Sequence, residues 1–234
     1  MTSKTISDLA LVGGHRALDL VNSVAPRVAA EERHDYLLTP GDLLTWSLRT
    51  GLVDTEAARG VEAAWSASPA AGRRALAAVR EIREALYEVL SARLGGAGSP
   101  ATASDQLDHI SRAWTSALTR ARLVPADGGP GVARWLLESP SALLVADRVA
   151  QDAVDLLCGI DVQRLGRCPV EAGGCGWLFL DHSRNRSRRW CTMEDCGSGA
   201  KARRLTQRRR SSRAAAHADR PIPEHLSLST MWTC

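Results

Sequence analysis

The chain has 234 residues, of which 44% are hydrophobic and 24% are charged, as in ordinary soluble domains. No run approaches the roughly 20 apolar residues that a membrane-spanning helix needs, and the opening MTSKTISDLALVGG lacks the parts of a secretory signal. We therefore expect a cytoplasmic protein without membrane contact, in which cysteines stay reduced.

The net charge of +4 is unevenly distributed along the chain. Residues 184–213 contain eleven Arg or Lys and two acids, a net charge of +9, which leaves −5 for all other residues. A mildly acidic body with a strongly basic end is typical of a nucleic-acid-binding module attached to another domain.

The first 160 residues are predicted to be mainly helical. Thr39 is a good N-cap because Pro40 and an acid follow it, and this helix should end near Gly51. Asp54 can cap the next helix. Residues 72–94 repeat apolar side chains at helical spacing and predict the longest helix of this part, followed by a glycine-rich loop over residues 95–100.

A further helix is expected to start near Ser104. Residues 121–136 contain two short apolar runs around a glycine-rich turn, which predicts a β-hairpin, and residues 140–158 predict another helix. This part contains no phosphate-binding glycine loop, and its histidines form no paired ligand motif, so we predict that the protein is not an enzyme. A catalytic site assembled only by the fold is the alternative.

The strongest chemical pattern consists of four cysteines in the last third of the chain. Two close pairs, Cys168 with Cys175 and Cys191 with Cys196, are separated by fifteen residues. This spacing is typical of a tetrahedral Zn²⁺ site, and four thiolates leave no open position for water, so the site should be structural. His182 in place of one thiol is the alternative.

The sequence around the cysteines predicts how they meet. Gly173 and Gly174 permit a tight turn, and residues 177–180 form an apolar strand whose antiparallel partner is expected at residues 162–165. A helix starting near Cys196 should supply the second thiol pair. A hairpin and a helix start around one ion define a treble clef.

These elements predict an α+β protein: a mainly helical N-terminal domain with a small β element, followed by a treble-clef finger with four cysteine ligands. We place the first domain at residues 1–160, the finger with its basic helix at 161–210, and a flexible tail at 211–234.

A zinc-built module coated with guanidinium groups is suited to bind a polyanion, chiefly through phosphate contacts. The candidate contacts are Arg184, Arg186, Arg188, Arg189, Lys201, Arg203, Arg204 and Arg208. DNA is the partner we expect, and RNA is not distinguished from it by these residues. The alternative is a zinc-stabilised module that docks an acidic protein without binding nucleic acid.

Several of these residues also follow a known family pattern. The matching segments are Cys175-Gly-Trp-Leu-Phe-Leu-Asp181, Ser183-Arg-Asn185, Arg188-Arg-Trp-Cys191, Met193 and Cys196-Gly197. They resemble the CGNR zinc-finger family, while Leu11-Val-Gly-Gly14 and Ala17-Leu-Asp-Leu-Val-Asn22 resemble the opening of the ABATE domain that precedes such fingers.

The resemblance implies a transcription regulator that holds DNA with its finger and whose α/β ABATE domain senses a small ligand or stress. It places the four cysteines at the ligand positions. A homodimer is compatible with such a regulator, although no heptad seam supports one. One departure is that Ser198 and Gly199 replace the Asn and Arg of the family motif, so Lys201, Arg203 or Arg204 would have to replace that Arg, or DNA would be held more weakly.

Overall fold

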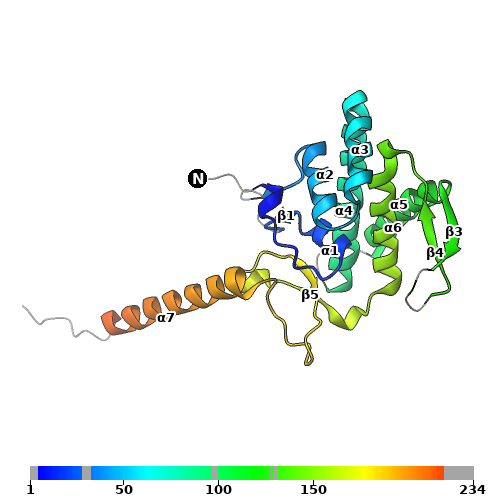
Figure 1. Ribbon diagram of the computed structural model, residues 1–234. Helices are drawn as coiled ribbons and strands as arrows, with labels where there is room; N and C mark the ends of the chain where they lie inside the picture. Colours follow the sequence, from blue (N-terminus) through cyan, green and yellow to red (C-terminus); the bar gives the residue numbers. More distant parts are fainter. Residues whose placement is uncertain (1–4, 28–32, 96–99, 127, 129–130, 219–234) are drawn as a thin grey trace, which may run out of the picture.

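The structure, a computed structural model, describes residues 5–27, 33–95, 100–126, 128 and 131–218. Figure 1 shows a helical body and, on one side of it, a small irregular module from which a long helix projects into solvent. The helices are α1 (Arg16–Val21), α2 (Pro40–Arg49), α3 (Thr55–Ala67), α4 (Pro69–Arg93), α5 (Pro100–Leu118), α6 (Ser141–Gly159) and α7 (Ser198–Ala218). The α+β class predicted from the sequence is confirmed.

Helix α4 forms the centre of the body and packs against α1, α2, α3, α5 and α6. Its buried side chains include Leu76, Val79, Ile82, Leu86 and Leu90, which recur at helical spacing along one face. The predicted helix at residues 72–94 is confirmed, and it begins three residues earlier at Pro69. This long apolar face sets the position of every other helix of the body.

The predicted start of α2 is confirmed in detail. The Thr39 hydroxyl accepts a hydrogen bond from the Asp42 amide (3.1 Å), and the Asp42 carboxylate accepts one from the Thr39 amide (2.8 Å). This reciprocal pair is a capping box, with Pro40 in the first turn. Asp54 caps α3 with a single hydrogen bond, its carboxylate accepting from the Ala57 amide (2.8 Å).

The strands form three separate antiparallel pairs. They are β1 (Val24–Ala25) with β2 (His34–Asp35), β3 (Ala121–Pro125) with β4 (Ala133–Leu137), and β5 (Leu165–Arg167) with β6 (Leu178–Leu180). The predicted hairpin at residues 121–136 corresponds to β3 and β4. Residues 127, 129 and 130 of its expected turn, and 96–99 of the loop after α4, lie outside the described residues.

One strand prediction was wrong. The partner of β6 was expected at residues 162–165, but Val162–Arg164 forms a 3-10 turn and the pairing strand starts at Leu165. The reason is local: the Asp161 carboxylate accepts from the Gln163 amide (3.0 Å), which turns the chain before it can extend. The strand therefore ends immediately before Cys168.

The predicted boundaries at residues 160 and 210 lie just after the end of α6 at Gly159 and within α7, respectively. Helix α7 continues beyond residue 210 to Ala218, so the first part of the expected tail is helical, and residues 219–234 lie outside the described part. At the other boundary, the finger residues Leu165, Trp177 and Phe179 belong to the same hydrophobic core as the body helices.

Candidate metal centre and basic surface

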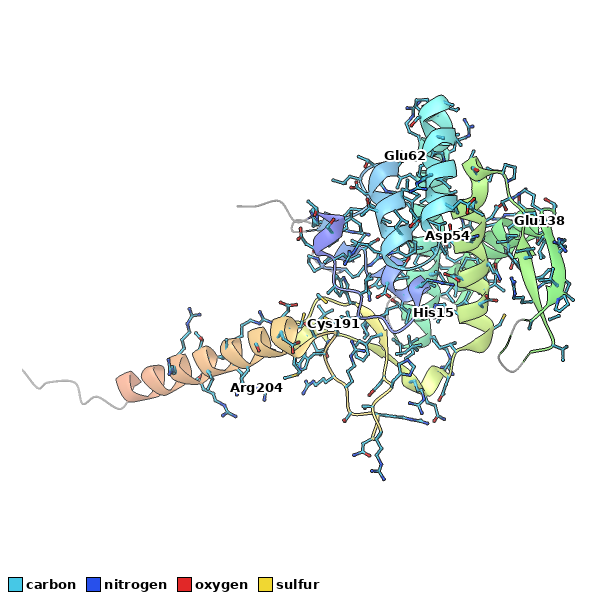
Figure 2. All side chains as sticks on the ribbon, viewed as in Figure 1. His15, Asp54, Glu62, Glu138, Cys191 and Arg204 are labelled. Carbon is cyan, nitrogen blue, oxygen red and sulfur yellow. The ribbon has the colours of Figure 1, made fainter. Side chains whose placement is uncertain are left out.

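The fold brings the four predicted thiols to one point. Cys168 directly follows β5, Cys175 precedes β6, Cys191 ends a long loop, and Cys196 lies in the π-helical turn that opens α7. Their sulfur atoms all lie within 4.8 Å of one another, with the Cys191 sulfur 3.4 Å from that of Cys175 and 3.5 Å from that of Cys196. Figure 2 places Cys191 at the base of α7.

These distances fit a zinc ion. A tetrahedral centre with Zn–S bonds of about 2.3 Å separates its sulfur atoms by about 3.8 Å. The hairpin between β5 and β6 supplies one thiol pair and the start of α7 supplies a member of the other, which is the predicted treble-clef arrangement. Cys168 and Cys191 are buried, and Cys175 and Cys196 are half-buried, so a bound ion would be shielded.

Two glycines make the first thiol pair sterically feasible. Gly173 has φ of +85°, a left-handed conformation that side chains rarely adopt. A Cβ atom at Gly174 would lie 2.6 Å from the Cys168 sulfur and 2.7 Å from the Pro169 carbonyl oxygen. Gly173 therefore permits the turn through its backbone conformation, and Gly174 permits the close approach of the Cys168 thiol.

The close approach of the four thiols also favours a bound cation. Hydrogen bonds from the thiols of Cys175 and Cys191 lower the pKa of Cys168 to about 2. The hydrogen bonds to Cys168 raise the pKa of Cys175 and of Cys191 far above the ordinary value. The thiols therefore change one another's pKa, and a divalent ion bound by the sulfur atoms would displace their protons.

His182 is not part of this cluster. It lies beside Gly14 of the body, where a Cβ atom would approach the His182 Nε2 to 3.2 Å. The alternative in which it replaces a thiol is therefore not supported. Cys158 is exposed on α6 and does not belong to the group of four.

The predicted basic residues divide into two sets according to their contacts. Three of them already bind protein groups. Arg186 donates to the Gln163 side chain and lies 3.8 Å from the Asp161 carboxylate, and Arg203 donates to the Gly173 carbonyl.

Arg188 is the most constrained of the three engaged arginines. It donates to the carbonyls of Val12 (2.8 Å) and Cys191 (2.6 Å), and its guanidinium lies 4.3 Å from the centre of the Phe179 ring. Arg188 therefore connects the body, the strand β6 and the loop that holds a thiol. Because a centre of four thiolates and Zn²⁺ has a net charge of −2, the charges of Arg188 and Arg203 beside its backbone also offset it.

The other set points into solvent. It comprises Arg184, Arg189, Lys201, Arg204 and Arg208, together with Arg209 and Arg210. All seven are exposed, and none has an acidic partner within the described residues, although the Arg189 guanidinium lies 5.4 Å from the centre of the Trp190 ring. Figure 2 shows Arg204 on the projecting part of α7. Of the three residues expected to replace the family's missing Arg, Lys201 and Arg204 are thus free, whereas Arg203 is engaged.

Over residues 201–211, helix α7 presents no apolar face that could be packed against a core. Residues 201–211 are all exposed, and Leu205 is the one large apolar side chain among them, with 48% of its surface accessible. A helical segment that is polar all round gains little from burial against a core.

The residues that join the finger to the body were missed by sequence reasoning as functional positions. Asn22 is fully buried and makes two hydrogen bonds to Leu178 of β6: its Nδ2 donates to the carbonyl (2.8 Å), and its Oδ1 accepts from the amide (2.9 Å). The Trp177 indole donates to the Val24 carbonyl (2.7 Å), and the Arg27 amide donates to the Cys175 carbonyl (2.8 Å).

A signal for this joint was present in the sequence. Asn22 ends the Ala17–Asn22 segment, and Gly13 and Gly14 precede it. The Gly13 carbonyl accepts a hydrogen bond from the Leu180 amide (2.8 Å), and the Gly13 amide donates to the Asp19 carboxylate (2.8 Å). A buried Asn after an apolar helix is a polar group that requires a partner, but nothing in its neighbourhood along the chain identifies that partner as residue 178.

A helical body followed by a four-cysteine treble clef with a basic helix defines a two-part zinc-finger protein. Comparison with known families agrees: the ABATE family model, described as "Putative stress-induced transcription regulator", matches residues 14–160, and the CGNR zinc finger model matches residues 164–209. The chain belongs to the ABATE family and has a CGNR zinc finger after that domain. The resemblance inferred from the sequence is thereby confirmed.

Neither of these families is described as enzymatic. No curated protein matches the chain. Among the described residues, no helix is both long and apolar enough to cross a membrane.

Proposed function

We propose that the protein is a transcription regulator that binds DNA through the finger and helix α7, and that its helical domain senses a ligand or a stress signal. The observation that carries the first half is the set of seven exposed basic side chains on the finger and α7 that have no acidic partner among the described residues. Such groups bind phosphates with a gain in free energy because they release the counterions condensed on DNA. The family description of the helical domain supports the second half.

The exposed basic side chains lie on two parts of the finger, helix α7 and the loop between the thiol pairs. Lys201, Arg204 and Arg208 follow one stripe of the helix, at spacings of three and four residues. Arg184 and Arg189 lie on the loop between the thiol pairs. With the helix as one arm and the loop as the other, the finger would hold the backbone of a duplex, and such contacts position a protein without selecting a sequence.

The test is a fluorescence anisotropy titration of a labelled DNA duplex with the zinc-loaded full chain at several salt concentrations. With about five phosphate contacts, the slope of log K against log salt is expected near −4 to −5. Replacing Lys201, Arg204 and Arg208 by Gln together should reduce the steepness of that slope by about 3.

The matched control replaces three exposed arginines of the body, Arg59, Arg73 and Arg74, by Gln. It changes the net charge by the same amount at a distance from the finger, and it should leave the slope unchanged. Equal loss of binding in both triple variants, or binding that is insensitive to salt, would contradict the proposal. A parallel titration with duplex RNA tests the preference for DNA.

A second function is favoured by two apolar side chains near the basic surface. Met193 and Leu205 are 62% and 48% exposed at the base and on the first turns of α7. Exposed apolar groups beside cations suit an acidic protein partner better than a phosphate backbone. If the finger docks a protein, heparin and DNA should fail to displace that partner in a competition experiment.

A further inference from the structure

A second potential binding site lies in the body, where α4, α5 and α6 converge. The pocket has a volume of about 470 Å³, within the range of small-molecule sites. Its walls are apolar and include Leu90 of α4, Leu107 of α5, Leu157 of α6 and Ile160. Leu107 leaves 42% of its surface exposed at the rim, so the pocket is accessible from solvent.

Among the described residues that line the pocket, Arg93 alone is charged. It is exposed at the end of α4, and no acidic group of the described residues pairs with it. A guanidinium binds a carboxylate with two parallel hydrogen bonds. An apolar wall with one free guanidinium is therefore complementary to a molecule with an apolar part and a carboxylate.

The pocket wall is also continuous with the start of the finger. The amide of Ile160 donates to the Leu156 carbonyl (2.9 Å) and ends α6. Val162, which lines the pocket, begins the turn that leads to β5 and then directly to Cys168. A ligand that orders these two side chains would act on the chain segment that carries the first zinc ligand.

We propose that this pocket binds a small apolar monocarboxylic acid, with the carboxylate at Arg93 and the aliphatic or aromatic part against Leu107 and Leu157. This assigns a ligand class to the sensing role, and only the link to DNA rests on the proposed function. Binding of the acid itself is independent of whether the finger holds DNA.

The experiment measures displacement of the fluorescent apolar sulfonate ANS from the zinc-loaded full chain by decanoate and by uncharged decanol. Decanoate is expected to displace the probe at lower concentration than decanol. Arg93→Gln should weaken decanoate about fivefold, which is typical of one exposed ion pair, and leave decanol unchanged. Arg74→Gln, an exposed arginine on the same helix, should change neither.

A second pair of variants locates the site. Ala103→Trp places an indole in the pocket and should weaken both competitors at least tenfold, whereas Ala101→Trp on the exposed side of the same helix should not. If Ala103→Trp fails to fold, Leu107→Glu replaces it: a negative charge at an exposed rim position should weaken decanoate alone. Full binding in Ala103→Trp or in Leu107→Glu would overturn the pocket, and equal affinity for decanoate and decanol would overturn the carboxylate.

The link to the finger is measured separately, as the change in DNA affinity on adding decanoate. A change of threefold or more that Arg93→Gln abolishes is expected. If decanoate binds and DNA affinity does not change, the link is wrong and the site stands. If no DNA binds at all, the proposed DNA function falls, and the displacement titration still decides the pocket.

Discussion

The joint between body and finger can be tested at Asn22. Its side chain makes two hydrogen bonds to the backbone of Leu178, a residue with no exposed surface. Asn22→Ala removes both partners and leaves a buried amide and a buried carbonyl in β6. Each unsatisfied group costs about 1–3 kcal/mol. We therefore expect the free energy of unfolding to fall by about 3 kcal/mol, a large share of a typical total of about 5–15 kcal/mol.

The measurement is urea denaturation of the zinc-loaded protein, followed by far-ultraviolet circular dichroism. The control is Asn185→Ala, the same substitution at an exposed position of the finger loop, where a change within about 0.5 kcal/mol is expected. Because Asn22 lies in the body and Leu178 in the finger, Asn22→Ala should also lower the temperature at which zinc is released. If it is no less stable than Asn185→Ala, the buried hydrogen bonds do not hold the two parts together and this reasoning fails.

Three further predictions concern the metal centre and the ion pairs of the body. Gly174→Ala should weaken zinc binding at least tenfold in competition with a chelating dye, because the added carbon would lie 2.6 Å from the Cys168 sulfur. The control is Gly199→Ala, whose added carbon would have its nearest contact at 3.4 Å. Equal zinc affinities of the two variants would contradict the steric argument. Removal of zinc by a chelator should strongly destabilise the finger, since metal binding contributes roughly 10–16 kcal/mol in comparable peptides. Elemental analysis should find one zinc per native chain. A metal-free protein with a folded C-terminal part would refute the zinc site. Burial opposes ionisation of Asp35, but its hydrogen bonds with Arg83 (2.7 and 2.8 Å) outweigh this and lower its pKa. The resulting stability is fully present above the unfolded-state pKa of about 4 and is lost as the pH falls through the lower folded value. Asp35→Asn should therefore flatten the decline in urea midpoint below pH 5 relative to the wild type, and parallel declines in the two proteins would exclude the Asp35–Arg83 pair as a cause.

Local signals in the sequence were sufficient for much of the fold. The cap at Thr39 and the apolar repeat of α4 depend on residues within a few positions of each other, and both predictions hold. The four thiols were identifiable because zinc restricts ligand type and spacing. Each of these features is determined by a short stretch of chain.

The features that were missed depend on contacts between distant residues. The sequence shows Arg188 as one more basic residue of the loop, whereas the structure uses it to bind the Val12 carbonyl 176 positions away. The register of β5 depended on one Asp161 side chain that competes with strand pairing. Charge composition therefore predicts how many cations a surface has, but tertiary contacts decide which of them remain free.

The attachment of β6 to residues 12–27 affects how this architecture could be recombined. Transplanting only residues 161–218 onto another scaffold would expose the Trp177 ring and leave the indole N–H and both polar groups of Leu178 without the acceptors and donors that Val24 and Asn22 provide. A working graft must bring the N-terminal stretch along with the cysteines, although more than a hundred residues separate them in the chain.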